Sequence, residues 1–446
     1  MQTSTRNQDM KRKLVSIISL LAMVTMLCGC EAFDTVSLPE TSEVKVSLNV
    51  TTTWSGKNIA SQNYQKFITA FTKSTGIEIT DSSETADEAF KQRVINDFRV
   101  GDEPDVMYFF TGNDVDSIIK AGKVVSLDEI QQYYPDFASN IEVGALQTSP
   151  YDGKIYSVPA CGYWEAMFVN THVCEEAGIE IPDENTTWDE FMDMCEQVKE
   201  AGYIPITASI ASEPHYLFEY FVYNNSYEGT QNVLPEKKGD EAYEAWKAGL
   251  EEFREVYKKG YFAKDSLYCD DATAFDYFLN NKAAFCISGS WMIPTILAEK
   301  NGQPKNYAVT FVPGTEARKN TDIIGGFSSG WYISRKAWND PDKRDAAVQF
   351  VEYMTQNSII ESFATITLGA TSLKGKAQYI DTTYSAIQKT AVDMLEKKTS
   401  IVPAVQDRVD ATVRSPLMDS IQDIVAGKKP IEQVLDRFIE DVKRSK

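Results

Sequence analysis

Two kinds of apolar spacing alternate along residues 44 to 110. Val44–Thr52, Gly76–Thr80 and Asp105–Phe110 are short runs rich in β-branched or aromatic residues, and each is predicted to form a strand. Between them, Asn63–Lys73 and Phe90–Val100 carry apolar residues at helical spacing. The resulting β-α-β-α-β order predicts an α/β fold with a parallel sheet covered by helices on both faces, whose ligands bind beyond the carboxyl ends of the strands.

The alternation continues through the rest of the chain. Trp188–Ala201 is predicted as a helix, because Thr187 and Glu190, three residues apart, form a capping box. Further strands are predicted at Ala283–Ile287 and Ala308–Val312, and further amphipathic helices at Asp345–Met354 and Pro430–Lys443. At 446 residues the chain is long for one core, so two domains are expected.

The N-terminal apolar run differs from these elements. Leu14–Leu27 is uninterrupted by polar faces but shorter than the roughly 20 residues that a membrane-spanning helix needs. Lys11, Arg12 and Lys13 precede it and small residues follow. This order of a basic stretch, an apolar stretch and small residues indicates a secretory signal peptide over residues 1–29.

The end of that run, Leu27-Cys28-Gly29-Cys30, resembles the lipobox of bacterial lipoproteins. The resemblance implies that Cys30 is acylated, for instance with palmitate, and becomes the mature N-terminus. Residues 30–43 would then be the anchored cysteine and a flexible linker, because this stretch is rich in Pro, Ser, Thr and acids. The protein is therefore expected at the outer face of the cytoplasmic membrane, extracellular or periplasmic and held by a lipid anchor.

The negative charge of the chain limits the classes of partner that it can bind. Residues 1 to 30 hold four of the 44 basic and one of the 65 acidic residues, so the mature chain would carry a formal charge of −24. Nucleic acids and anionic lipid headgroups both need a basic footprint, so neither is expected as a partner. An aromatic content of 11% leaves rings for a ligand as well as for cores.

Five cysteines remain besides Cys28 and Cys30, namely Cys161, Cys174, Cys195, Cys269 and Cys286. They form no CxxC or Cys/His cluster of the kind that holds zinc, and an odd number cannot all pair internally. Buried thiols are expected, and the spacing also leaves room for one internal disulfide. No metal or cofactor is predicted.

Several motifs in fixed order resemble the sugar-binding, maltose-binding-protein-like extracellular solute-binding proteins of ABC transporters. "GDEPDV" within Arg99–Val106, "DGKIYSVP" within Tyr151–Pro159 and "GSW" at Gly289–Trp291 are similar to the family's motifs. Other matching stretches are Ser74–Ile77, Gly122–Asp128, Phe168–Asn170, Ala177–Phe191 and Asn281–Ala284.

The resemblance implies a two-lobed, type II periplasmic-binding-protein-like fold. Each lobe would be a mainly parallel sheet with flanking helices, and the ligand cleft would lie between the lobes. The expected lobes are residues 44–158 with 309–370 and residues 159–308 with 371–446, with chain crossings at Pro159–Glu165 and Asn306–Pro313. The resemblance also implies a monomer that captures a carbohydrate, closes around it and docks on the permease subunits of an ABC importer.

Sugar recognition favours aromatic rings for the apolar faces of pyranoses. Trp54 follows the first predicted strand, where the family places cleft residues. Tyr163, Trp164 and Glu165 follow the expected crossing, and Trp291 matches the family's "GsW" tryptophan. We predict that these residues contact ligand, although packing within a core or hinge is the alternative for each.

Polar candidates complete the predicted site. Asn113 and Asp114 follow the strand at Asp105–Phe110 and can accept hydrogen bonds from sugar hydroxyls. Phe327 lies in the segment expected to return to the first lobe. Where the maltose-binding protein has cleft aromatics, this chain has Arg408 and Asp410. The ligand would thus be a sugar held by bidentate hydrogen bonds, or one that carries amine or acid groups.

Two other functions fit parts of the sequence. A surface glycoside hydrolase needs only two carboxylates about 5 to 10 Å apart, and the chain is acidic and aromatic-rich. A serine hydrolase does not fit, because Gly326–Gly330 reads G-x-S-x-G but both histidines, His172 and His215, precede it. A ferric-ion-binding receptor of the same architecture would use clustered tyrosines, of which Tyr133-Tyr134 is the only adjacent pair.

Overall fold

A computed structural model describes residues 46–226, 233–299, 304–315, 317–375, 384–409 and 411–445. Residues 45–446 form one compact unit. The predicted signal peptide, Cys30, the linker and Asp410 lie outside the described residues. Among the described residues, every helix is too short or too polar to cross a lipid bilayer.

The first sheet contains the predicted β-α-β-α-β unit. Its strands, in the spatial order β2-β1-β3-β9, are β1 (Ser47–Thr51), β2 (Glu78–Asp81), β3 (Val106–Phe110) and β9 (Ser329–Ile333). β1 runs parallel to β2 and to β3, whereas β9 runs antiparallel to β3. The first five elements predicted from the sequence are therefore confirmed in type and order.

Helices cover both faces of this sheet, because successive side chains of a strand point to opposite faces. On β3, Val106 and Tyr108 join one apolar core, and Met107 and Phe109 join a second. The first core is covered by α2 (Ile59–Thr75), α5 (Leu127–Tyr133), α12 (Arg335–Asn339), α13 (Pro341–Met354) and α14 (Asn357–Thr367). The second is covered by α3 (Glu88–Val100) and α4 (Asp116–Lys120).

The second sheet has the order β10-β8-β4-β6-β5, with β7 also paired to β4. Its strands are β4 (Tyr163–Asn170), β5 (Ile204–Thr207), β6 (Ala283–Gly289), β7 (Tyr307–Thr310), β8 (Asp322–Gly326) and β10 (Ser400–Val402). β4 runs antiparallel to β6, β7 and β8, while β5 is parallel to β6 and β10 to β8. The two-lobed α/β class is as predicted. The prediction of mainly parallel sheets holds for the first sheet only, because β6, β7 and β8 all run antiparallel to β4.

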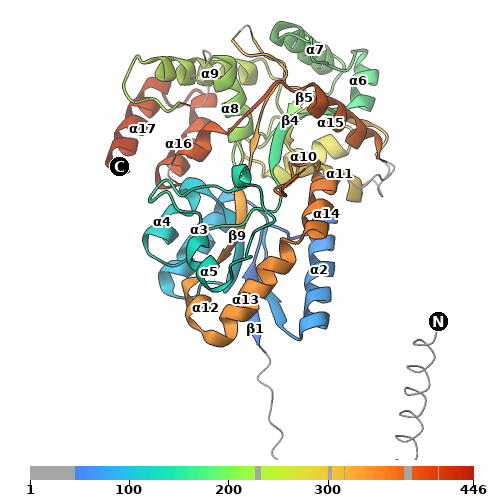
Figure 1. Cartoon of the computed structure of the whole chain (residues 1–446). Helices are drawn as coiled ribbons and strands as arrows, with labels where there is room; N and C mark the ends of the chain where they lie inside the picture. Colours follow the sequence, from blue (N-terminus) through green and yellow to red (C-terminus); the bar gives the residue numbers. More distant parts are fainter. Residues whose placement is uncertain are drawn as a thin grey trace, which may run out of the picture. The chain divides into compact units, whose positions relative to one another are not determined.

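Two apolar cores lie against this sheet as well. One is built from α6 (Thr171–Ala177), α7 (Trp188–Glu200), α8 (His215–Asn224), α9 (Glu241–Lys258), α16 (Ala411–Val425) and α17 (Ile431–Ser445). The other is built from α10 (Asp271–Leu279), α11 (Met292–Glu299) and α15 (Ala386–Lys397). Three 3₁₀ helices, η1 (Gly112–Asp114), η2 (Val143–Ala145) and η3 (Val405–Arg408), connect elements. Figure 1 shows α3, α4, α5, α12 and α13 around β1 and β9, and α6 to α9 with α15 to α17 around β4 and β5.

Helix ends follow from local sequence. Thr187 accepts from the backbone N–H of Glu190 while the Glu190 carboxylate accepts from that of Thr187, which confirms the predicted capping box of α7. α3 begins after Asp87, whose side chain accepts from Phe90 N–H, and ends at Gly101 with a φ of 85°. These caps satisfy backbone groups that no helical hydrogen bond reaches.

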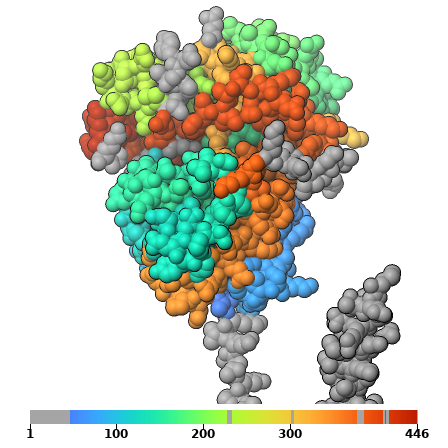
Figure 2. All heavy atoms as spheres, in the orientation of Figure 1, coloured from blue at the N-terminus to red at the C-terminus, as the bar shows by residue number. Residues whose placement is uncertain are grey.

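The chain changes lobes at a place that differs from the expected boundary. Val158 pairs with Trp331 beside the first sheet, and Tyr163 pairs with Gly326 in the second, so one crossing lies between Val158 and Tyr163. The predicted crossing at Asn306–Pro313 is wrong, because β7 and β8 still pair with β4. The chain crosses at residues 327–328, between β8 and β9. In Figure 2 orange and red segments of the C-terminal third lie in both lobes.

Three segments at the lobe boundary lie against one another with backbone in contact. They are the first crossing, the end of β8, and residues 368–373, through which the chain leads from α14 in the first lobe toward α15 in the second. We call these three the crossing segments. Gly162 N–H donates to Ala370 O at 2.6 Å, and Cys161 pairs with Thr371 as an isolated antiparallel bridge. A methyl group on Gly369 would lie 2.1 Å from the carbonyl oxygen of Gly162, and one on Gly325 would lie 2.6 Å from that of Tyr163. Only hydrogen fits at these positions, so the glycines let the crossings pack as one bundle.

Gly369→Ala should lower the free energy of unfolding by about 2 kcal/mol or more, because its methyl group would meet backbone that cannot rotate away. Urea denaturation of the mature chain measures the change. Gly144→Ala is the matched control, since a methyl group there has nothing within 4 Å. An equal effect of the two substitutions would contradict the close-packing account of the crossings.

Candidate ligand-binding cleft

Loops that follow the parallel strands lie near the contact between the lobes, which we call the candidate cleft. β1, β2 and β3 end at one edge of the first sheet and are followed by Trp54, by the loop Ser82–Asp87 and by η1. β5 and β6 end at Thr207 and Gly289 at one edge of the second sheet. This is where ligands bind in open α/β sheets.

A small cavity lies at the end of β5 and β6. Its volume is about 10 Å³, which is the space of about one water molecule. Polar and aromatic residues in its wall include Thr207, Ser209, Glu213, Tyr216, Asp271 and Ser288. A sugar-sized molecule can occupy this place only if the surrounding elements move apart.

Trp291 provides an aromatic surface beside the cavity. Its half-buried indole lies 5.4 Å from the ring of Tyr216 and 5.9 Å from that of Tyr163, measured between ring centroids. Gly289 makes this placement possible, because a methyl group there would lie 2.1 Å from the indole ring. The "GSW" motif therefore combines a strand end without a side chain and a ring that lies over it.

Two neutral polar groups adjoin these rings. Glu213 Oε2 lies 3.2 Å from His215 Nδ1, and the Glu213 side chain is only 10% exposed. Burial, reinforced by Asp271, raises the pKa of Glu213 to about 8. Burial, together with the charges of Lys91 and Arg414, lowers the pKa of His215 to about 3. Both groups are mainly uncharged at pH 7, so they can exchange hydrogen bonds with hydroxyls without burying a charge.

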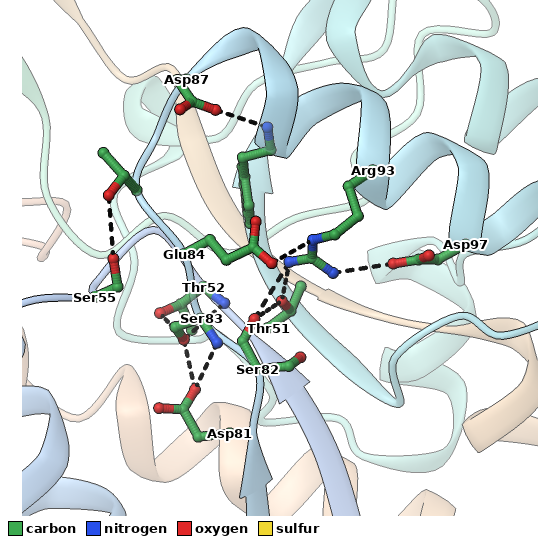
Figure 3. Close-up of polar contacts among 12 residues, drawn as sticks. Thr51, Thr52, Ser55, Asp81, Ser82, Ser83, Glu84, Asp87, Arg93 and Asp97 are labelled. Carbon is green, nitrogen blue, oxygen red and sulfur yellow. Dashed lines mark hydrogen bonds and ion pairs between the residues drawn. The ribbon is translucent and has the colours of Figure 1, made fainter. Parts of the chain in front are cut away.

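The loop on the first-lobe side is fixed by its own polar network (Figure 3). Arg93 binds Glu84 at 2.9 Å, Asp97 at 3.0 Å and the hydroxyl of Thr51 at 3.2 Å. The hydroxyl of Ser83 lies 2.5 Å from Asp81 Oδ1. These contacts tie the loop after β2 to the end of β1 and to α3.

Asp114 has a different role from the predicted hydroxyl acceptor. Arg414 from α16 donates to its Oδ1, and Lys91 Nζ lies 3.3 Å from its Oδ2. Burial opposes the charge, but Lys91 and Arg414 lower the pKa of the Asp114 carboxyl below its ordinary value. Asn113, also predicted, is half-buried beside it in η1.

Three other predicted residues lie within the lobes. Trp54 is stacked on Tyr108 at 4.3 Å and on Phe363 at 4.4 Å, so its ring packs inside the first lobe. Trp164 is 2% exposed and donates through Nε1 to Leu368 O at 3.0 Å, and Glu165 is equally buried. The packing alternative therefore describes Trp54, Trp164 and Glu165 better than a ligand contact does.

The remaining predicted residues flank the cleft or fall outside the description. Phe327 is half-buried at the crossing between β8 and β9 and packs against the first-lobe core. Tyr163 and Trp291 are the two predicted aromatics that the structure brings together. Arg408 is exposed at the end of η3, and Asp410 lies outside the described residues.

Glu213, Tyr216 and Arg414 are not among the site residues predicted from the sequence. The sequence pattern does not predict the strand β5, so it does not indicate the residues that follow its carboxyl end. The available signal was the polar-aromatic stretch Glu213-Pro214-His215-Tyr216 that opens α8 and contains one of only two histidines.

All five internal cysteines are free thiols, and burial raises the pKa of Cys161 to about 11. Tyr134 donates to Asp345 in the first lobe, away from the cleft loops. Within the described ranges, no three His, Cys, Asp or Glu side chains gather as metal ligands would.

Two lobes, three packed crossings and a cleft at the strand ends define a two-lobed solute-binding protein. The sequence profile of the bacterial extracellular solute-binding proteins matches residues 66–390. The chain therefore belongs to this family. No curated protein sequence matches the chain.

Solved structures share the fold at low sequence identity. A chitin oligosaccharide binding protein superposes with a TM-score of 0.76 at 20% identity, covering 90% of this chain and 98% of its own. The bacterial solute receptor AcbH, whose preferred substrate is β-D-galactopyranose, gives 0.72 at 18% identity, with 90% and 99% covered. The maltose/maltodextrin-binding domain MalE from Bdellovibrio bacteriovorus, bound to maltotriose, gives 0.69 at 17% identity, with 90% and 100% covered.

Glu213 should make folding stability depend on pH. Its folded pKa of about 8 lies above the ordinary 4.5, so the unfolded chain releases this proton first as the pH rises. The free energy of unfolding should therefore fall by about 3 kcal/mol between pH 5 and pH 8 on account of this group. Glu213→Gln should remove that component, measured as the difference between wild-type and variant urea curves.

The same variant supplies its own control. At pH 5 Glu213 is protonated in the folded chain, so the uncharged glutamine should come closest to wild-type stability there. A difference between the two proteins that stays constant from pH 5 to pH 8 would show that Glu213 does not titrate in this range.

Proposed function

We propose that the mature chain captures a carbohydrate between its lobes and delivers it, chemically unchanged, to an ABC importer. The observation that carries the proposal is the aromatic surface of Trp291, Tyr216 and Tyr163 beside uncharged Glu213 and His215. Aromatic rings suit the apolar faces of pyranoses, and neutral polar groups suit hydroxyls. The sugar-binding names of the three similar structures support the same substrate class.

Closure is the proposed working step. The cavity has a wall made by second-lobe residues and holds about one water, so in this proposal the sugar enters an open form and then bridges both lobes. Contacts made only in the closed form shift the population toward it. The closed form is the one that a permease recognises in this proposal, and a monomer suffices for it.

The two alternative functions, a glycoside hydrolase and a ferric-ion receptor, predict a different fate for the ligand. A glycoside hydrolase would consume its ligand, and a ferric receptor would lose binding when iron is chelated. A binding protein returns the sugar intact. Incubation with each ligand followed by chromatography separates these outcomes.

Trp291→Ala should weaken sugar binding about thirtyfold or more, because a buried aromatic contact is removed from the site. A thermal-shift screen with mono- and oligosaccharides, amino sugars and uronic acids identifies the ligand, and calorimetry measures the loss. Tyr133→Ala, which removes an aromatic ring that is 63% exposed, is the control. Wild-type affinity in Trp291→Ala would exclude the aromatic surface as the site.

We also propose that Cys30 anchors the protein at the outer face of the membrane. Cys30→Ser should abolish acylation and release the protein from the membrane fraction, because one polar residue replaces the anchor of the acyl chains. Cys28→Ser is the matched control, since Cys28 would leave with the signal peptide. Fractionation and palmitate labelling of both variants measure this, and release by the two substitutions alike would contradict the assignment.

A further inference from the structure

Four charged side chains meet where the two lobes touch. Glu88 and Lys91 belong to α3 and Asp114 to η1 in the first lobe, whereas Arg414 belongs to α16 in the second. Arg414 Nη2 contacts Asp114 and lies 3.2 Å from Glu88 Oε1. Lys91 Nζ lies 2.9 Å from Glu88 Oε1 and 3.3 Å from Asp114 Oδ2. We call these four residues the interlobe ion cluster.

The interlobe ion cluster is electrically balanced and largely removed from water. The side chains of Arg414, Asp114 and Lys91 are 3%, 5% and 13% exposed, and that of Glu88 is 34% exposed. Two positive and two negative groups cancel. A buried ion pair contributes little net stability, but removal of one partner is costly because the other charge stays buried without compensation. The lobes can therefore close without a large penalty only when the charges of the cluster balance.

Each half of the cluster is fixed to its own lobe. Phe90 and Val94 anchor α3 in the first-lobe core, and Val413 and Leu417 anchor α16 in a second-lobe core. The first turn of α16 thus carries Arg414 on a rigid element. Separation of the lobes must break the contacts of Arg414 with Glu88 and Asp114.

The cluster also adjoins the cleft without forming the cavity wall. Arg414, Lys91, Glu88 and Asp114 are absent from the residues that line the cavity. The positive charges of Lys91 and Arg414 nevertheless help to lower the pKa of His215 beside it. The cluster is thus close to His215, and a change in the distance between the lobes would change both the cluster and the candidate cleft.

We propose that Arg414 is a positioning residue for ligand capture, which favours the closed form from outside the cavity by completing the interlobe ion cluster. Its effect on closure concerns the lobes alone, whereas its effect on sugar affinity rests on the proposed function. Closure and affinity can therefore be measured separately.

The test is Arg414→Gln in the mature chain. Small-angle scattering should give a larger radius of gyration for the unliganded variant than for the unliganded wild type. The dissociation constant for the sugar found in the thermal-shift screen should rise about thirtyfold or more, mainly through faster dissociation, because closure would leave a buried carboxylate uncompensated. Arg414→Lys should retain part of the affinity, since it keeps the charge but loses the planar fork.

Two further variants separate charge balance from general damage. Arg335→Gln breaks a pair with Glu129, at 2.5 Å, that lies wholly within the first lobe, so it should alter neither scattering nor affinity. The double variant Arg414→Gln with Asp114→Asn leaves Lys91 and Glu88 as a balanced pair. It should regain much of the affinity lost by Arg414→Gln alone.

Three results would overturn the proposal. These are wild-type scattering and affinity in Arg414→Gln, an equal loss in Arg335→Gln, or a double variant that binds no better than the single one. If the wild type binds no sugar at all, the proposed function fails, and the scattering comparison of unliganded proteins still decides the role of Arg414.

Discussion

Backbone contact between the three crossing segments is the constraint on which the rest of the structure depends. Gly162, Gly325 and Gly369 bring carbonyl oxygens to positions where a methyl group would not fit. Each lobe has its own pair of apolar cores around its own sheet. The crossings thus join two rigid bodies through a narrow bundle, and the loops at the strand ends meet as a consequence.

Burial acts to raise the pKa of two carboxylates at this meeting place, but the charges beside them differ. Asp114 has Lys91 and Arg414 beside it, and its pKa is lowered. Glu213 has Asp271 near it, and its pKa is raised to about 8. The same side-chain chemistry therefore gives a fixed charge at the lobe contact and a neutral hydrogen-bonding group at the cavity.

The sequence predicted the fold more fully than the site. The spacing in Val44–Phe110 gave three strands and two helices that the structure confirms, because each segment buries a face whose period is visible locally. The sequence pattern does not predict the strand β5, because Ile204–Thr207 is only four residues long and follows a helix closely. Without it, the place of Glu213 and Tyr216 beside Trp291 could not be inferred.

The sequence by itself determined the family and the two-lobed α/β class, since these rest on short motifs and local periodicity. Only the tertiary structure decided which rings each tryptophan packs against, because Trp54 and Trp164 differ from Trp291 in neighbours that are distant in the chain. It also decided that Arg414, 300 residues after Asp114, joins Lys91 as a second cation beside it. Contacts between lobes depend on how whole bodies meet, and no local pattern records that.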